Sequence, residues 1–332
     1  MLVSVLMPVF NAGAAAGFLG DAIASVLAQE GVQWELLACD DGSTDGSGEW
    51  LEALARKDRR LRVVRQPNAG VVPALNRLLA SARGRYLARM DADDVMMPQR
   101  LARQVAFLEE HPAIGVLGGW LEQIDAAGQR RGLLRYATDP GAVESGLVFR
   151  NTLGHPAVMM RREIFGLPHS PTGLRYQTRA RHVEDYALWI EASARWGLAN
   201  MPEVLLRYRI HENSVGARHA AQQQHASVAL QLSFLRDRLG IQATPAERRL
   251  HAALAFDRLE ATPEFCAAAM RWLRKLAEGN LQRIGRKGFP GDAFLRVLTG
   301  RYVAVVKKAR QAQIDVEERA EPFGAYMHAA AI

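Results

Sequence analysis

Three carboxylates stand within four positions of the chain. Asp91, Asp93 and Asp94 follow an apolar run at 86–90 that predicts a short strand, and Pro98 then favours the start of a helix. Like charges repel, so a folded protein needs a reason to gather them at a strand end. A bound Mg²⁺ or Mn²⁺ is such a reason, because both ions prefer oxygen ligands. A solvated acidic turn that caps the next helix is the alternative, and it is the better interpretation of an isolated D-x-D pattern.

The elements that must position this cluster alternate along the chain. Apolar runs at 2–10, 34–39, 61–64 and 86–90 predict strands, and helical spacing at 18–29, 49–56 and 71–82 predicts helices between them. Such alternation is typical of βαβ units, so we expect an α/β fold with a mostly parallel, twisted sheet flanked by helices. Ligands of such sheets bind at the carboxyl ends of the strands. Those ends are the polar segments 8–11, 40–43, 67–70 and 91–94.

The ends of the first two strands suggest a nucleotide site of an unusual kind. The chain has neither a G-x-G-x-x-G sequence after its first strand nor a Walker A sequence. The Asp41 carboxylate can accept a hydrogen bond from a base N–H, and the turn formed by Pro8, Val9 and Asn11 can offer backbone groups to the same base. The alternative for 40–45 is a turn followed by a helix cap, and both interpretations can hold together.

The second half of the fold adds further candidates. Glu184 and Asp185 open a predicted helix, where the helix dipole favours acidic residues for purely structural reasons; the functional alternative is a general base beside the acidic cluster. His211 ends a predicted strand after two arginines and is placed to face a pyrophosphate. The segment 167–182 lacks periodicity and is rich in proline, glycine and arginine, so a binding lid and a solvated loop are equally good interpretations.

Composition limits the function classes. The 332 residues are 49% hydrophobic and 23% charged, as in ordinary globular proteins. The two cysteines, Cys39 and Cys266, lack metal-ligand spacing and predict a reducing, cytoplasmic environment. No apolar run approaches the roughly 18 residues of a membrane span. The formal charge of +7 permits binding to nucleic acid, anionic lipid or phosphorylated substrates and selects none of them.

The C-terminal third has a different pattern. Helical periodicity dominates from about residue 220, and between Arg271 and Arg310 eleven basic residues face only Glu278 and Asp292. With aromatic residues interspersed, this stretch can make peripheral contact with an anionic membrane surface; an ordinary solvated helical face is the alternative, which we favour. Nucleic-acid binding is not expected, because the basic run lies outside any recognisable recognition module.

Seven segments, in order, resemble the family 2 glycosyltransferases, which are inverting, nucleotide-sugar-dependent enzymes of GT-A fold. They are 3–11, 40–45, 89–94, 110–112 with 118–120, 155–159, 184–189 and 207–211. The resemblance covers residues 1–216, the expected glycosyltransferase domain, and leaves 217–332 as a helical region of unknown role. A Q-x-x-R-W sequence, found in processive members, is missing, so the resemblance implies the addition of one sugar.

The resemblance also implies roles. Asp41 would read the base, usually uracil; Asp91 would lie near the ribose; Asp93 would bind the Mg²⁺ or Mn²⁺; Asp185 would be the catalytic base; and His211 would approach the metal or diphosphate. The expected nucleotide-sugar-binding set is Pro8, Val9, Asn11, Asp41, Asp91, Ala92 and Glu184. The partners would be a nucleotide sugar, most simply a UDP-sugar, and a glycan or lipid-linked acceptor. The enzyme would be cytoplasmic or peripheral at the inner face of the membrane.

Two other functions remain open at this point. A sugar nucleotidyltransferase shares the βαβ sheet and the acidic cluster, but it usually carries a basic, glycine-rich loop after the first strand, and residues 11–14 contain no basic residue. A non-enzymatic nucleic-acid-binding protein would fit the charge alone.

Overall fold

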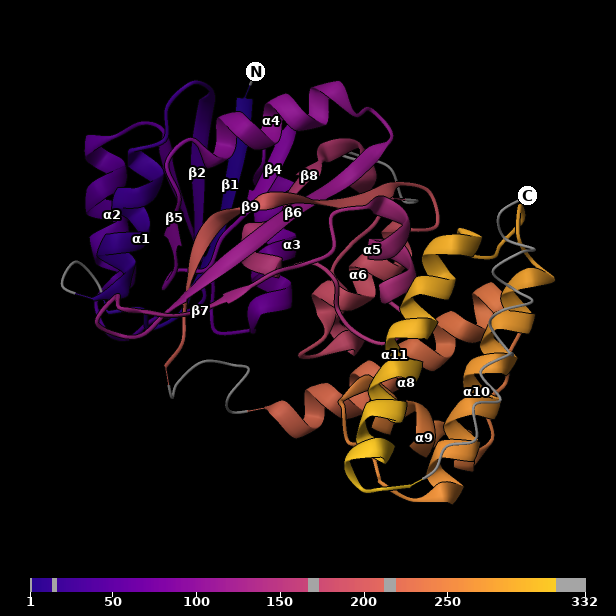
Figure 1. Ribbon diagram of the computed structural model, residues 1–332. Coiled ribbons are helices and arrows are strands. Elements are labelled where there is room, and N and C mark those ends of the chain that lie inside the picture. Colours follow the sequence, from indigo (N-terminus) through magenta and orange to yellow (C-terminus); the bar gives the residue numbers. More distant parts are fainter. Residues whose placement is uncertain (1, 14–16, 167–172, 212–218, 315–332) are drawn as a thin grey trace. The chain divides into compact units, whose positions relative to one another are not determined.

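The computed structural model describes residues 2–13, 17–166, 173–211 and 219–314. Its chain divides into two compact units, one formed by residues 1–138 and 153–220, the other by residues 139–152 and 221–332. Figure 1 shows both units. The first carries a nine-stranded sheet, and the second is helical.

The N-terminal half of the sheet has the predicted alternating order. Its elements are β1 (Leu2–Val9), α1 (Phe18–Leu27), β2 (Gln33–Asp40), α2 (Ser47–Lys57), β3 (Leu61–Arg65), α3 (Val71–Ser81) and β4 (Tyr86–Arg89). The strands lie in the order β3-β2-β1-β4 and all pair in parallel. The residues of β1, β2 and β4 are almost entirely buried because helices cover both faces, which explains their continuous apolar runs, whereas those of the outer strand β3 are mostly half-buried.

Beyond β4 the sheet becomes mixed. The further elements of this unit are β5 (Val95–Met96), α4 (Arg100–Glu110), β6 (Ile114–Ile124), β7 (Arg130–Leu134), β8 (Met159–Arg161), α6 (Glu184–Ala192) and β9 (Gly197–Arg209). The order continues β4-β8-β6-β9-β5, with β7 on β6. The β6–β9 pair is parallel, whereas β8 runs antiparallel to both of its neighbours. The α/β fold with a twisted sheet is confirmed, and the parallel pattern belongs mainly to its first half.

Two predicted boundaries were wrong. The helix expected to begin at Pro98 begins at Arg100, because residues 95–96 first pair with β9 as an edge strand. The apolar residues of 155–160 also predict a strand, but this segment starts with a 3-10 turn, His155–Ala157, and only then enters β8. The sequence of 121–135 predicts a hairpin that turns near Asp125, and β6 and β7 form it. His211 lies just beyond the end of β9.

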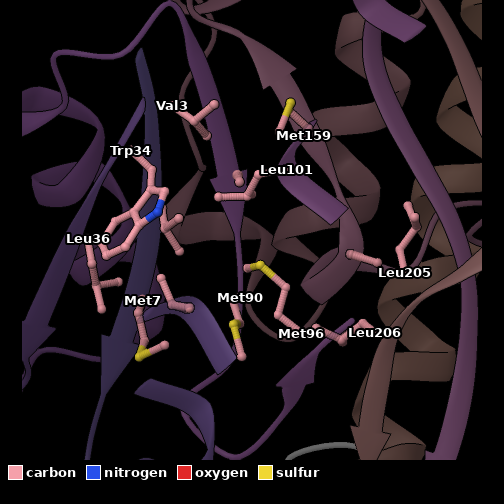
Figure 2. Close-up of a cluster of buried hydrophobic side chains, with 14 of the residues drawn as sticks. Val3, Met7, Trp34, Leu36, Met90, Met96, Leu101, Met159, Leu205 and Leu206 are labelled. Atoms are coloured by element: carbon pink, nitrogen blue, oxygen red, sulfur yellow. The ribbon is translucent and has the colours of Figure 1, made fainter. Parts of the chain in front are cut away.

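One hydrophobic cluster supports the strand ends of the first unit. Figure 2 shows Met7 and Trp34, from β1 and β2, in one cluster with Met90, which follows β4, and with Met96 and Leu206 from β5 and β9. All of these side chains are buried. Since a packed core resists displacement, the turns after these strands start from fixed positions.

The helical unit contains α5 (Pro140–Gly146), α8 (Ala220–Leu239), α9 (Pro245–Ala255), α10 (Pro263–Leu281) and α11 (Gly291–Gln311). Thr244 and Glu247 have the spacing of a capping box in the sequence, and they form one at the start of α9. The sequence placed only residues 217–332 in this region, whereas the structure adds residues 139–152. His251 shows the reason: its Nε2 lies 3.1 Å from the Val148 carbonyl, and its Nδ1 accepts a hydrogen bond from Trp272. Among the described helices, none is long and apolar enough to cross a bilayer.

Candidate functional site: a carboxylate cluster at the ends of the strands

The turns after β1 and β2 are fastened to each other. The Asp41 amide donates to the Val9 carbonyl (2.8 Å), and the Asn11 amide donates to Ser43 Oγ (3.0 Å). Asn11 Oδ1 in turn accepts the Thr44 amide hydrogen at 2.8 Å. Asn11 has φ 49°, a conformation that asparagine tolerates better than most residues. The predicted base-binding turn of Pro8, Val9 and Asn11 therefore adjoins Asp41.

The Asp41 carboxylate is 4% exposed and already organises the neighbouring loop. Its Oδ1 accepts hydrogen bonds from Gln66 Nε2 (2.7 Å) and the Ala69 amide (2.9 Å), and its Oδ2 accepts one from the Gly70 amide (2.8 Å). A carboxylate offers about four acceptor positions, so one further donor, such as a base N–H, can be accommodated. Asp41 thus has a structural task that sequence reasoning did not foresee.

The acidic cluster forms as the spacing suggested. One oxygen from each of Asp91, Asp93 and Asp94 lies within 4.8 Å of the others. His211 Nε2 lies 2.9 Å from Asp93 Oδ2. Burial and neighbouring carboxylates raise the pKa of Asp93, and they raise the pKa of the fully buried Asp94 further. The three acids that the sequence places after this strand thus lie together, and His211 joins them through Asp93.

The three acids differ in their partners. Asp91 forms an ion pair with Arg89, a buried arginine whose Nε has no hydrogen-bond partner among the described residues. Asp94 Oδ1 accepts the Arg209 amide hydrogen at 2.8 Å, while its buried Oδ2 lacks a partner in the described chain. Hard oxygen donors with one unsatisfied buried oxygen fit Mg²⁺ or Mn²⁺, so the residues present suit the expected ion. Sequence reasoning gave no role to Arg89, although it lies only two positions before Asp91.

The first turn of α6 lies within electrostatic reach of this cluster. Glu184 is half-buried, and burial together with the charge of Asp185 raises its pKa to about 7. The charge of Asp91 raises this pKa as well, whereas the charge of Arg89 lowers it. Asp185 Oδ1 accepts the Tyr186 amide hydrogen at 2.7 Å. Because charge effects weaken with distance, these shifts associate Glu184 with the Arg89–Asp91 pair.

Tyr176 fixes the segment that precedes α6. Its backbone N–H donates to Asn76 Oδ1 (3.1 Å), its carbonyl accepts from Asn76 Nδ2 (2.8 Å), and its hydroxyl lies 2.9 Å from His155 Nε2. Burial and the charge of Arg89 hold the pKa of His155 well below its usual range, so this imidazole is neutral. Residues 173–181 are thus anchored at Tyr176, and 167–172 of the expected loop lie outside the described residues. In the sequence, the only indication of this anchor was a tyrosine, Tyr176, in an otherwise polar segment.

Asp41 does not contact the acidic cluster directly. It follows β2, which is separated from β4 by β1, so the two groups lie about 10 Å apart along the rim by strand spacing. A nucleoside diphosphate can span such a gap. The structure therefore places Asp41 and the cluster at one edge of the sheet, as expected for the carboxyl ends of parallel strands.

Comparison with known proteins agrees with this arrangement. A model of glycosyl transferase family 2 matches residues 4–166. The chain is 34% identical over 216 residues to a provisionally named glycosyltransferase, EpsE of Bacillus subtilis, covering 64% of this chain and 73% of EpsE. It is 31% identical over 220 residues to a provisionally named teichuronic acid biosynthesis glycosyltransferase, TuaG of the same species, covering 65% and 82% of the two chains.

Two solved structures share the fold. S. aureus TarS 1-349 in complex with UDP-GlcNAc has a TM-score of 0.56 and 16% identity, covering 93% of this chain and 90% of that one. The mannosyltransferase PcManGT from Pyrobaculum calidifontis, in complex with GDP-Man and Mn²⁺, has a TM-score of 0.50 and 18% identity, covering 99% and 85%. Family match, relatives and fold agree, and the chain belongs to glycosyltransferase family 2.

Proposed function

We propose that this glycosyltransferase moves one sugar from a nucleotide sugar, most simply a UDP-sugar, to a hydroxyl of a glycan or lipid-linked acceptor, with a divalent cation and with inversion. The observation that carries the proposal is the cluster of Asp91, Asp93, Asp94 and His211 at the strand ends, with an unsatisfied oxygen on Asp94. TarS bound to UDP-GlcNAc and PcManGT bound to GDP-Man and Mn²⁺ support the ligand classes. Membership of the family argues against the nucleotidyltransferase and nucleic-acid-binding alternatives.

In this proposal, different residues at the strand ends bind the base, the ribose and the cation. Asp41 and the turn of Pro8, Val9 and Asn11 bind the base, while Asp91 and Ala92 lie toward the ribose. Asp93, with Asp94 and His211, holds Mg²⁺ or Mn²⁺, which when bound neutralises charge on the leaving diphosphate. Arg89 fixes the Asp91 carboxylate through their ion pair, and Glu184 lines the donor side next to Asp185.

Asp185 acts as the general base in this proposal. It takes the proton from the acceptor hydroxyl as the oxygen attacks the anomeric carbon on the face opposite the diphosphate. One base without a covalent intermediate gives a single displacement, hence inversion. The anchored segment at Tyr176 supports this role, because it fixes the chain shortly before α6.

A nucleotide-sugar screen tests the donor proposal. We expect a UDP-sugar to raise the melting temperature only when Mn²⁺ is present. In Asp93→Ala the Mn²⁺-dependent part should disappear, whereas Asp237→Ala, which removes an exposed carboxylate from the helical unit, should behave like wild type. If only GDP-sugars raise the melting temperature, the donor is a GDP-sugar and not a UDP-sugar. If the melting temperature stays unchanged with every nucleotide sugar, the donor proposal is wrong.

We also propose peripheral contact with an anionic membrane surface through the basic helical region. Along α11 the exposed positions Arg296, Gly300, Val303 and Lys307 recur at three- and four-residue spacing, and Lys308 is exposed beside them. Val303 is 54% exposed and therefore available for contact on this face. An apolar side chain among exposed lysines is the pattern of interfacial helices.

A further inference from the structure

Arg209, the last residue of β9, is only 3% exposed although it lies at the rim of the sheet. Its guanidinium donates hydrogen bonds to four oxygen atoms in three separate segments: the Asp93 carbonyl, the Asp125 and Ala126 carbonyls, and Asp21 Oδ2. The guanidinium also lies over the Phe18 ring, 4.4 Å from its centroid. Sequence reasoning noted this arginine only as a neighbour of His211.

Two of its contacts hold the turn that bears the carboxylates. Arg209 Nε donates to the Asp93 carbonyl at 2.8 Å, and its backbone N–H donates to Asp94 Oδ1, also at 2.8 Å. One residue therefore fixes both the backbone at Asp93 and the side chain of Asp94. Since the chain continues directly to His211, the same residue sets where that imidazole meets Asp93 Oδ2.

The remaining contacts attach this assembly to its surroundings. Nη1 donates to the Asp125 and Ala126 carbonyls, at 3.2 and 3.1 Å, in the turn between β6 and β7. Nη2 donates to Asp21 on α1 at 3.1 Å. Phe18, at the start of α1, also lies beside His211, with ring centroids 5.4 Å apart. The planar guanidinium can donate hydrogen bonds to all of these acceptors at the same time. A lysine ammonium lacks this planar arrangement of N–H donors and cannot replace it.

We infer that Arg209 is a positioning residue that holds Asp93, Asp94 and His211 in the geometry that binds the cation. The inference rests on the proposed function for the cation itself. Arg209 does not need to touch the metal: its contribution is to orient groups that do, and such outer partners usually affect metal affinity strongly. Its buried positive charge also opposes the mutual repulsion of the neighbouring carboxylates.

Arg207, two residues earlier on β9, supplies a matched control. Its side chain is 48% exposed and its Nε pairs with Glu122 at 3.0 Å on the surface. Arg207→Gln and Arg209→Gln each remove one guanidinium from the same strand. A comparison of the two variants therefore excludes effects of composition and net charge. Arg209→Lys keeps the charge and removes the fork.

Hydrogen exchange of the metal-free proteins gives the first readout. In Arg209→Gln we expect amides of 90–97 and 123–128 to exchange faster by roughly tenfold or more, as for the loss of a charge-assisted hydrogen bond. Amides of β1 and β2 should keep wild-type rates, Arg207→Gln should match wild type throughout, and Arg209→Lys should be intermediate. Wild-type rates at 90–97 in Arg209→Gln would overturn the inference, as would a uniform acceleration that includes β1 and β2 in both Arg209 variants.

Mn²⁺ titration by calorimetry gives the second readout. Arg209→Gln should bind Mn²⁺ roughly 10- to 100-fold more weakly, while Arg207→Gln stays within about twofold of wild type. Unchanged Mn²⁺ affinity in a folded Arg209→Gln would also overturn the inference. If wild type itself binds no Mn²⁺, the proposed metal function fails, and the exchange experiment still decides whether Arg209 organises the turn.

Discussion

At the residue scale, the three carboxylates of the cluster are not equivalent, although they are neighbours in the sequence. Asp91 is engaged by the Arg89 guanidinium, Asp93 by His211, and Asp94 by the Arg209 amide with one oxygen left unsatisfied. A cation is attracted most by oxygens that are buried and lack another positive partner. This difference favours Asp93 and Asp94 as ligands and leaves Asp91 for the donor.

Asp94→Asn tests this division. The variant keeps an oxygen that can accept the Arg209 amide hydrogen and removes one negative charge from the cluster. We expect Mn²⁺ affinity to fall at least as much as the roughly 10-fold loss that removal of an outer partner causes. Calorimetry would measure it, with Asp237→Asn as the surface control. Wild-type affinity would exclude Asp94 as a ligand.

Asp185→Asn tests the proposed base. Loss of a general base typically lowers turnover by about 10²- to 10⁴-fold, so transfer should nearly cease while donor binding persists. Steady-state kinetics and donor titration separate the two effects. Glu191→Gln, an exposed acid on the same helix, is the control. Unchanged turnover in Asp185→Asn would remove this residue from the mechanism.

At the element scale, the segment before α6 is attached to α3 by one amide. Asn76 uses both its oxygen and its nitrogen on the backbone of Tyr176, whose ring is 2% exposed. The buried His155–Tyr176 contact adds a second attachment. The start of α6, and with it the candidate base, therefore depends on contacts made a hundred residues away.

Asn76→Asp should release this attachment. The new carboxylate cannot donate to the Tyr176 carbonyl and repels it, a loss of about 1–3 kcal/mol. Trypsin should then cut faster after Arg175, Arg179 and Arg181, as followed by mass spectrometry. Gln129→Glu makes the same chemical change at an exposed hairpin position. Equal cleavage rates in the two variants would show that the amide does not hold the segment.

In the helical unit, His251 on α9 predicts a pH dependence of stability. Burial lowers the pKa of His251 from 6.5 to about 4, although the hydrogen bond to the Val148 carbonyl raises it. Between pH 6.5 and pH 4, His251 is protonated in the unfolded chain but stays neutral in the folded chain. The stabilisation that comes from the neutral imidazole is fully present above pH 6.5 and is lost as the pH falls toward 4, and the loss amounts to about 3 kcal/mol.

His251→Gln should remove that part of the pH dependence. Urea unfolding followed by circular dichroism at pH 7, 5.5 and 4.5 would compare the variant with wild type. His111→Gln, which replaces an exposed histidine, controls for the loss of an imidazole. A wild-type slope in His251→Gln would assign the acid sensitivity to other groups.

At the scale of the whole molecule, the net charge of +7 is unevenly distributed along the chain. Eleven basic residues and two acidic ones occur between Arg271 and Arg310, and exposed Lys307 and Lys308 accompany Val303 on α11. Each basic residue near an anionic surface contributes about 1 kcal/mol, and salt screens the attraction.

Vesicle sedimentation tests the membrane proposal. The protein should bind vesicles containing phosphatidylglycerol more strongly than pure phosphatidylcholine vesicles, and less at high salt. Replacing Lys307 and Lys308 by glutamine should weaken binding by about 2 kcal/mol. The same replacement of the exposed Arg56 and Lys57 on α2 should weaken it less. Equal losses would indicate a response to net charge alone.

The sequence by itself determined the α/β alternation, the position of the acidic turn and the family. Each is a local property: apolar runs of strand length, helical spacing between them, and polar residues directly after a strand. Parallel strands then bring their carboxyl ends together whatever the details of packing, so 8–11, 40–43 and 91–94 had to meet at one edge. The individual roles of the residues at that edge remain predictions.

Only the tertiary structure decided how those residues are held. His211 meets Asp93 across 118 positions, Arg209 reaches Asp21 across 188, and Tyr176 is fixed by Asn76 across 100. Residues 139–152 likewise joined the helical unit through His251, 103 positions from Val148. The partner of a buried polar group is chosen by strand order and register in three dimensions, and neither is encoded in the spacing of its neighbours along the chain.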